Sequence, residues 1–312
     1  MSDIDISIII PVYFNEGSIK LTYKVLKEQI LSMFPDLNFE IIFIDDGSRD
    51  NSYKEMCELK ELDDNVNLIQ FTRNFGQVSA FYAGYEFSKG RGILNLAADL
   101  QEPPELIVSM IDSFIKKEAM IIAGKRIERD ESFYRTKTSQ VFYYFMRKLS
   151  FSNMPNGGFD IVLLDQKVKD FILESKESNP FWQGQILWSG YSVKFIPYNR
   201  QKREIGKSKW TFTKKTKYLL DGVLNYSYAP LRFFSILGII SFLLGIIYTI
   251  VIVISYFKGN SPFKGWAPIM IIILLFSGLQ FVMMGLIGEY LWRAFEQIKK
   301  RPKYLINEKK IK

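Results

Sequence analysis

Asp99 and Gln101 are the residues of this chain whose types and spacing best suit a charged ligand. They follow the short apolar run 93–98, which is typical of a strand covered on both faces. Pro103 and Pro104 end any strand pairing, and Pro104 can begin a helix. Because open α/β sheets bind ligands at the carboxyl ends of their strands, the pair could hold Mg2+ or Mn2+ with a diphosphate. The alternative is that Asp99 only caps the next helix.

The chain has the alternating pattern of an α/β protein. Apolar runs at 6–12, 39–44, 66–71, 92–98 and 120–123 alternate with segments of helical spacing, which predicts a mostly parallel sheet flanked by helices. The polar clusters that follow these runs would share one edge of the sheet, and that edge is the predicted binding site. The sequence contains neither the glycine motif of dinucleotide-binding folds nor a P-loop, which leaves a nucleotide-diphosphate site that neutralises charge through a metal.

Two uncharged runs, Phe233–Phe257 and Trp266–Gly288, are each longer than the roughly 20 residues that a helix needs to cross a bilayer. A buried hairpin of a soluble protein is the alternative. The net charge of +8 is concentrated in 194–217 and 296–312, on either side of these runs. The positive-inside rule therefore places both flanks in the cytoplasm and the short loop 258–265 outside. The spans favour lipid over nucleic acid as the anionic partner of this basic chain.

Cys57 is the only cysteine and there is no histidine, which excludes a disulfide framework, a cysteine zinc site and histidine-based catalysis. The first residues lack the basic and apolar regions of a signal peptide, so residues 1–228 are expected in the cytoplasm. Between the basic segment and the first span, residues 211–228 mix aromatic side chains with lysines. This mixture predicts an interfacial amphipathic helix, with a plain linker as the alternative.

Several short motifs occur in a fixed order along the chain. They are Ile10-Pro11-Val12-Tyr13 with Asn15-Glu16, Asp45-Asp46-Gly47-Ser48, Arg73-Asn74-Phe75-Gly76, Asp99-Leu100-Gln101 before Pro103-Pro104-Glu105, Arg203 with Gly206, Ser208, Lys209 and Trp210, Gly288-Glu289-Tyr290 with Arg293, and Arg301-Pro302 with Tyr304. Each motif is weak alone, but in this order and spacing they resemble the polyisoprenyl-phosphate glycosyltransferases of glycosyltransferase family 2. That family includes bactoprenol glucosyltransferases and dolichol-phosphate mannose synthases. The resemblance covers nearly the whole chain.

The resemblance implies a GT-A fold and a division of the chain into four parts. Residues 1–210 would form the cytoplasmic catalytic domain, and 211–230 a juxtamembrane amphipathic segment. Residues 231–295 would hold two transmembrane helices, at about 233–257 and 266–290. Residues 296–312 would be a basic cytoplasmic tail. A bacterial inner-membrane protein with both termini in the cytoplasm is therefore expected, and the family resemblance also implies a homo-oligomer, with a tetramer as one form.

The resemblance also assigns a donor side. The nucleotide-sugar-binding residues would be Pro11, Tyr13, Glu16, Asp45, Asp46, Asp99 and Gln101. Two alternatives stay open, because Pro11 can simply end a strand and Asp45 can simply cap a helix. Asp99 and Gln101 would also be the metal ligands, with Mg2+ or Mn2+ as the cofactor. The family usually has a carboxylate two residues before Asp99, where this chain has Ala97, and fewer charged ligands hold a hard cation less tightly.

The acceptor side follows from the same resemblance. The phosphate of the acceptor would be bound by Arg126, Arg135, Ser139, Arg203 and Lys209, although a solvated basic face is the alternative for the last two. Asp160 matches the aspartate proposed as the catalytic base of the family, and it is expected to be catalytic together with Asp99. Since a phosphate monoester is largely dianionic at neutral pH, Asp160 could instead orient the acceptor or the sugar.

The expected reaction is the inverting transfer of a hexose, in the first place glucose from UDP-glucose, to undecaprenyl phosphate for surface glycan modification. The nearest alternative is the same reaction with mannose, galactose, GlcNAc or an amino-arabinose derivative. A different class is a non-catalytic membrane protein that binds nucleotide sugar or acts as a scaffold, and Ala97 is its only support. A processive polysaccharide synthase is disfavoured, because two spans cannot readily build an export channel.

Overall fold

The structure is a computed structural model of the 312-residue chain. It describes residues 4–99, 101–127, 144, 147–148, 151, 153–155, 158–175, 177–178, 180–201, 222, 224–227, 229–258 and 267–311. These residues divide into two compact units, one formed by 1–222 with 301–312 and the other by 223–300.

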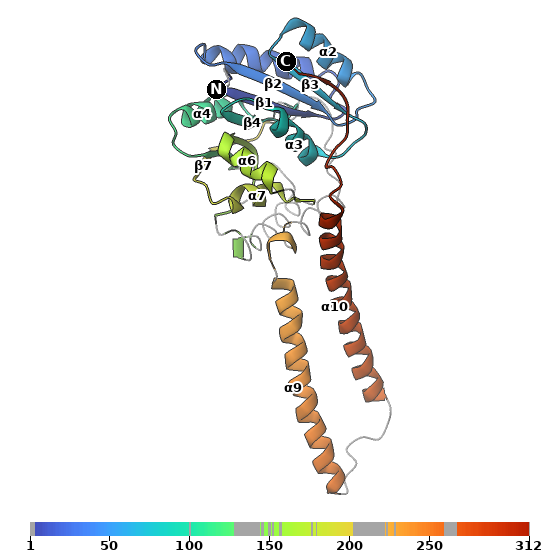
Figure 1. Ribbon diagram of the computed structural model, residues 1–312. Helices are drawn as coiled ribbons and strands as arrows, with labels where there is room; N and C mark the ends of the chain where they lie inside the picture. The colour runs from blue at the N-terminus through green and yellow to red at the C-terminus, as the bar shows by residue number, and fades with distance from the viewer. Residues whose placement is uncertain are drawn as a thin grey trace. The chain divides into compact units, whose positions relative to one another are not determined.

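An eight-stranded sheet in the order β7-β5-β6-β4-β1-β2-β3-β8 forms the centre of the first unit (Figure 1). The strands are β1 (Ile6–Val12), β2 (Phe39–Asp45), β3 (Val66–Phe71), β4 (Gly92–Asn95), β5 (Ile121–Arg126), β6 (Phe159–Asp165), β7 (Val193–Tyr198) and β8 (Ile306–Lys310). Strand β1 pairs in parallel with β2 and β4, β2 with β3, and β5 with β7. Strand β6 is antiparallel to β4 and β5, and β8 is antiparallel to β3. The predicted mostly parallel sheet flanked by helices is thereby confirmed.

Helices cover both faces of this sheet because its strands are apolar on both sides. On one face, α1 (Ile19–Val25), the π and 3-10 turns Leu26–Ile30 and Leu31–Met33, α2 (Ser52–Leu62) and α4 (Pro104–Ile115) share a core with Ile8 and Ile10 of β1. On the other face lies α3 (Gln77–Phe87), where a Cβ on Gly84 would come within 2.4 Å of Ile9. Helices α6 (Gln166–Glu174) and α7 (Trp182–Trp188) also belong to this unit.

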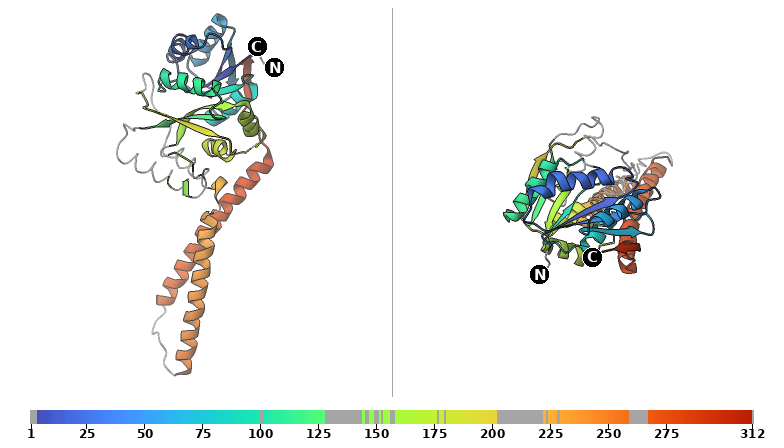
Figure 2. Two further views of the ribbon diagram at one scale, coloured as in Figure 1. Left: turned by 90° about the vertical axis from the view of Figure 1, so that its left-hand side faces the viewer. Right: turned by 90° about the horizontal axis from the view of Figure 1, so that it is seen from above.

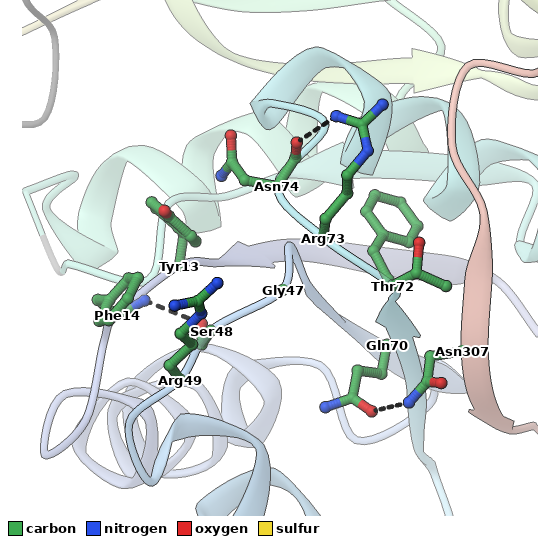
Figure 3. A pocket seen from close by; sticks show the side chains of 11 residues that line it. Tyr13, Phe14, Gly47, Ser48, Arg49, Gln70, Thr72, Arg73, Asn74 and Asn307 are labelled. Atoms are coloured by element: carbon green, nitrogen blue, oxygen red, sulfur yellow. Dashed lines mark hydrogen bonds between the residues drawn. The ribbon is translucent and has the colours of Figure 1, made fainter.

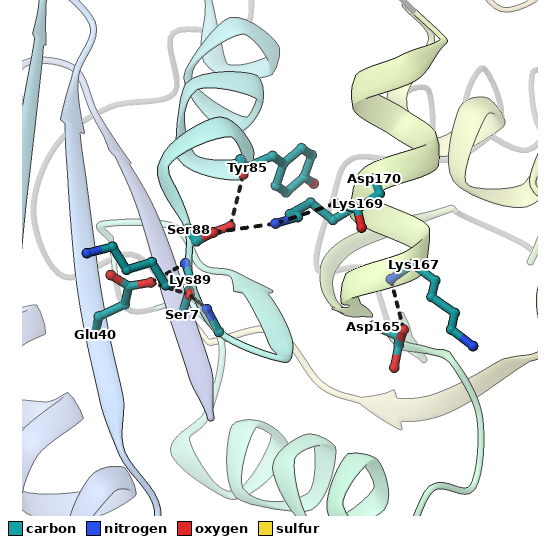
Figure 4. A network of polar contacts seen from close by, with 10 residues as sticks. Ser7, Glu40, Tyr85, Ser88, Lys89, Asp165, Lys167, Lys169 and Asp170 are labelled. Atoms are coloured by element: carbon teal, nitrogen blue, oxygen red, sulfur yellow. Dashed lines mark hydrogen bonds and ion pairs between the residues drawn. The ribbon is translucent and has the colours of Figure 1, made fainter. Parts of the chain in front are cut away.

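A buried carboxylate fastens the amino-terminal ends of the central strands (Figure 4). Glu40 of β2 is only 3% exposed, and it accepts hydrogen bonds from Ser7 Oγ at 2.6 Å, the Lys89 backbone N–H at 2.6 Å and Asn67 Nδ2 at 3.0 Å. These donors come from β1, the α3–β4 loop and β3. Since each donor offsets part of the cost of burying the charge, Glu40 has a structural role at the edge opposite the carboxyl ends.

The second unit contains α9 (Ala229–Phe257) and α10 (Ala267–Lys299), which contact each other (Figure 2). Large apolar side chains along α9, such as Phe233, Ile239 and Leu244, are exposed. Among the described residues, the segment Ala229–Tyr248 is long and apolar enough by length and composition to cross a membrane. The second expected span lies in α10, which this criterion does not select, so it stays a prediction. Most of the expected amphipathic segment 211–230 lies outside the described residues.

Candidate active site

A cavity of about 510 Å³ opens at the carboxyl ends of β1, β2 and β3 (Figure 3). It is lined by the loops that follow these strands, by the last two residues of β3 and by one residue of β8. The lining residues are Tyr13, Phe14, Gly47, Ser48, Arg49, Gln70, Phe71, Thr72, Arg73, Asn74 and Asn307. A volume of this size lies within the range of about 300–1,000 Å³ that is usual for small-molecule sites. The predicted edge of the sheet therefore carries a pocket whose lining combines aromatic rings with amide and guanidinium groups.

The first loop of the pocket, after β1, is held by hydrogen bonds to the second. The backbone N–H of Phe14, at φ +54°, donates to Ser48 Oγ at 3.0 Å. The carboxylate of Glu16 accepts from Asn51 through Nδ2 at 2.7 Å and through the backbone N–H at 3.2 Å. Pro11 sits within β1 opposite Ile44. In this structure Tyr13 lines the pocket, while Glu16 joins the two loops beside it.

Asp45, at the end of β2, is fully buried and binds two residues that line the pocket, Ser48 and Gln70. Its Oδ1 accepts from the Ser48 N–H at 3.0 Å, and its Oδ2 accepts from Gln70 Nε2 at 3.2 Å. Gln70 itself lines the pocket. The carboxylate therefore orients an amide that faces the cavity, and sequence reasoning missed Gln70 because a glutamine on an apolar strand carries no motif.

Asp46, the next residue, holds the third loop of the pocket. Its carboxylate is 3% exposed and accepts from Asn74 Nδ2 at 2.7 Å, the Phe75 N–H at 2.6 Å and the Gly76 N–H at 2.9 Å. These N–H groups precede α3, where a carboxylate is favoured by the helix dipole. Within this structure Asp46 fixes the backbone of the 73–76 loop, which carries two pocket residues, Arg73 and Asn74.

Asp46→Ala is expected to lower the free energy of unfolding by about 3 kcal/mol, because it leaves two backbone N–H groups and one amide without their charged acceptor. Chemical denaturation of the full chain measures this change. Asp36→Ala is the matched control, since Asp36 is exposed and should change stability by less than about 0.5 kcal/mol. Equal denaturation midpoints for the two variants would contradict the positioning role of Asp46.

Asp99 and Gln101 lie in the turn between β4 and α4, so the predicted strand end comes earlier, at Asn95. Asp99 is 8% exposed. Gln101 is joined to Gln201 twice, through the backbone N–H of Gln201 at 2.9 Å and through its own Nε2, which donates to the Gln201 carbonyl at 3.3 Å. These two hydrogen bonds hold the turn that contains Gln101 against Gln201.

Glu102 adds a second buried carboxyl group beside Asp99, and sequence reasoning did not single it out. It is 4% exposed, and burial raises its pKa to about 7, with the Asp99 charge acting in the same direction. The positive charges of Arg200 and Arg126 oppose this rise. Two carboxyl groups and two guanidinium groups therefore interact electrostatically near Asp99, where the sequence predicted a site for a cation and a diphosphate.

Arg126 and Asp160, which the resemblance assigned to phosphate binding and catalysis, form an ion pair in this structure. Arg126 ends β5 and Asp160 is near the start of β6, so the antiparallel pairing of these strands brings them together. The Arg126 side chain is 13% exposed and that of Asp160 is 40% exposed. Because the Asp160 carboxylate is engaged by a guanidinium, the geometry suits orientation of Arg126 better than removal of a proton.

Four of the expected acceptor-binding residues, Arg135, Ser139, Arg203 and Lys209, lie outside the described residues. The described part of the chain contains no group of three or more His, Cys, Asp or Glu side chains arranged for a metal. At the predicted metal site Ala97 supplies no ligand, so the prediction depends on the side-chain oxygens of Asp99 and Gln101. Such a donor set suits a cation held largely by the oxygens of a bound diphosphate.

Comparison with known proteins gives two family matches. Residues 7–170 match the family model described as Glycosyl transferase family 2, and residues 229–293 match the GtrB C-terminal hairpin. The uncharacterized glycosyltransferase YkcC of Bacillus subtilis is 34% identical, over 98% of this chain and 94% of its own length. The bactoprenol glucosyl transferase of Shigella phage SfII is 29% identical, over 97% of both chains. Among solved structures, glucosyl-3-phosphoglycerate synthase from Mycobacterium tuberculosis aligns with a TM-score of 0.47 at 12% identity, covering 70% of this chain and 79% of that one.

Proposed function

Because the chain belongs to glycosyltransferase family 2, and is therefore a transferase, we propose that it moves a hexose from a nucleotide donor to a polyprenyl phosphate. Glucose from UDP-glucose is the proposed donor, and undecaprenyl phosphate at the cytoplasmic face of the bacterial inner membrane is the proposed acceptor. The observation that carries the proposal is the match over 97% of both chains to a protein named bactoprenol glucosyl transferase. The product would be a lipid-linked sugar for modification of surface glycans.

The pocket at the ends of β1–β3 supports this assignment on the donor side. Its volume and its mixture of aromatic, amide and guanidinium groups suit a nucleoside with its attached phosphate. The charged cluster around Asp99 would then receive the diphosphate. Asp99 and Gln101 would hold Mg2+ or Mn2+ there, and when bound the cation would neutralise the charge that develops on the leaving diphosphate.

The acceptor phosphate would attack the anomeric carbon in line, so that an α-linked donor gives a β-linked product. This phosphate has a second pKa of about 6 and is largely dianionic at neutral pH, so it needs little help from a base. Arg126 would bind the phosphate through its planar fork of donors, and Asp160 would hold that fork in place. Catalysis would come mainly from positioning and from charge stabilisation.

The membrane part of the proposal is a two-helix hairpin with both chain ends in the cytoplasm. The match of residues 229–293 to the GtrB C-terminal hairpin supports it, together with the apolar segment Ala229–Tyr248. An acceptor whose phosphate lies at the headgroup level would meet the catalytic unit on that side of the bilayer. A homo-oligomer, with a tetramer as one form, belongs to the same proposal.

The decisive experiment uses membranes that contain the full chain, supplied with undecaprenyl phosphate and one radiolabelled nucleotide sugar at a time. Label from UDP-glucose is expected in the lipid fraction, and the transfer should stop when EDTA removes divalent cations and resume with added Mn2+. If only a different donor, such as one carrying mannose or GlcNAc, labels the lipid, the proposed donor sugar is wrong but the proposed transfer to a polyprenyl phosphate stands. No labelled lipid with any donor would favour the non-catalytic alternative that Ala97 suggests.

A further inference from the structure

The strand β8 brings a residue from the far end of the chain into the donor pocket. After α10, Tyr304 stacks on Phe71 of β3, with ring centroids 4.9 Å apart and an interplanar angle of 13°, and its hydroxyl donates to Glu86. The backbone N–H of Thr72 donates to the Leu305 carbonyl at 3.0 Å. These contacts fix the tail on the end of β3 just before β8 begins. The next residues of the tail therefore have a defined place beside the pocket.

A bulge in the β3–β8 ladder turns one side chain of this tail toward the cavity. Glu308 is opposite Gln70 and Ile306 is opposite Phe71, so Asn307 is the extra residue between them. Bulges of this kind often re-aim a side chain next to a functional site. Asn307 lines the pocket, and its Nδ2 donates to Gln70 Oε1 at 2.8 Å (Figure 3).

The buried carboxylate of Asp45 determines which way both amides face. A carboxylate accepts hydrogen bonds only, so Gln70 must present its nitrogen to Asp45, as the 3.2 Å contact requires. The oxygen of Gln70 then points the other way, and Asn307 must present its own nitrogen to it. The carbonyl oxygen of Asn307 and the second N–H of Gln70 remain for a ligand. The pair offers one acceptor and one donor at the wall of the pocket.

We propose that Asn307, which is oriented by the hydrogen bonds from Asp45 through Gln70, reads the base of the nucleotide donor. The inference rests on the proposed function, because it takes a uridine diphosphate sugar as the ligand. Uracil carries an N–H beside a carbonyl oxygen on its pairing edge, which complements the acceptor of Asn307 and the donor of Gln70. Asn307 is thus a specificity-determining residue that comes from the strand after the C-terminal hairpin.

The test compares UDP with pyrophosphate, which lacks the uridine nucleoside, and with CDP, which has the same ribose and diphosphate but a different pairing edge on its base. Isothermal titration of the full chain in detergent, with Mn2+ present, measures the dissociation constants of UDP, CDP and pyrophosphate. Asn307→Ala is expected to weaken UDP binding about tenfold, the effect of losing one directed hydrogen bond and leaving its partner unsatisfied. Pyrophosphate binding should stay within about twofold of that of the unmodified chain, because no base contact is involved. Lys309→Ala, two residues along the same strand and outside the pocket lining, is the matched control and should change none of these constants.

The outcomes distinguish a failure of the proposed role of Asn307 from a failure of the proposed transferase function. If Asn307→Ala leaves UDP binding unchanged, or weakens UDP and pyrophosphate equally, Asn307 does not read the base, while the proposed transferase reaction stands. If the unmodified chain binds UDP no more tightly than pyrophosphate, the uridine donor itself is wrong, and the inference fails with it. A loss of UDP affinity in Asn307→Ala that exceeds the loss of CDP affinity supports both. An equal loss for UDP and CDP would show that Asn307 contacts the ribose and does not read the base.

Discussion

Asp99→Asn is expected to reduce the rate of sugar transfer by about 100- to 1,000-fold, the range seen when one preorganised group that stabilises charge is removed. Asp99 is the only carboxylate of the usual motif that this chain keeps, since Ala97 occupies the other position. Its side chain is 8% exposed beside the buried Glu102, so an isosteric amide changes the charge with little change in packing. The measurement is kcat/KM for transfer of labelled glucose to undecaprenyl phosphate.

The control for this variant is Asp112→Asn on α4, the helix that follows the same turn. Asp112 forms an exposed ion pair with Lys116 at 2.6 Å, and an exposed pair of this kind contributes little to stability. Its transfer rate should equal that of the unmodified chain. Membrane insertion of both variants is checked by fractionation. Transfer by Asp99→Asn within threefold of the control, at equal protein in the membrane, would show that Asp99 carries no catalytic charge chemistry.

Gly47→Ala is expected to weaken nucleotide binding by at least about 100-fold and to lower the free energy of unfolding by about 3 kcal/mol. Gly47 has φ +74°, and a Cβ at this position would lie 2.5 Å from the Arg73 carbonyl carbon and 2.9 Å from the Asn74 nitrogen. Both are backbone atoms, so no side chain can rotate away. The second and third loops of the pocket must move apart, and both line it.

A second glycine separates the clash from the conformational cost. Gly190 has a similar φ of +72°, but no atom lies within 4 Å of the place where its Cβ would be. Gly190→Ala therefore has the cost of the left-handed backbone alone, about 1 kcal/mol, and should leave UDP binding unchanged. Titration with UDP and chemical denaturation measure the two quantities. Equal UDP affinity in the two variants would mean that the loops do not need this close approach to bind the nucleotide.

The parallel core could be predicted from the sequence because its strands are continuous apolar runs. Residues 6–12 of β1 and 39–45 of β2 are almost completely buried, as expected for central strands that helices cover on both faces. Strand β8 gave no such signal. Its sequence, Ile-Asn-Glu-Lys-Lys, is polar because it is an exposed edge strand, and its pairing with β3 depends on contacts far apart in the chain. The expected basic tail therefore contains a strand that its composition does not indicate.

The sequence predicted the edge of the sheet that carries the pocket, because parallel strands end at one edge, but it did not predict most of the side chains that line the pocket. Asp45 and Asp46 bind residues that line the pocket, and Asp99 is not among the lining residues. Asp45 accepts a hydrogen bond from Gln70 of β3, and Asp46 accepts one from the Phe75 N–H in the loop after β3. These partners are far from the two aspartates in the sequence, so the folded sheet is needed to identify them. Gln70 and Asn307 enter the pocket only through these contacts. A pattern of residue types cannot reveal this series of hydrogen bonds without the fold.

Strand β3 is synthesised long before β8, the strand with which it pairs. Gln70 and Asn307 are separated by 237 positions, and both apolar helices are translated between them. On the ribosome, β3 is finished long before its partner exists, so its edge has unpaired backbone groups while the hairpin is being made. An exposed edge of this kind is a template for aggregation. Chains truncated after α10 lack β8 and should therefore depend on chaperones or be degraded. This is expected even though residues 1–222, which form nearly all of the first unit, have been translated.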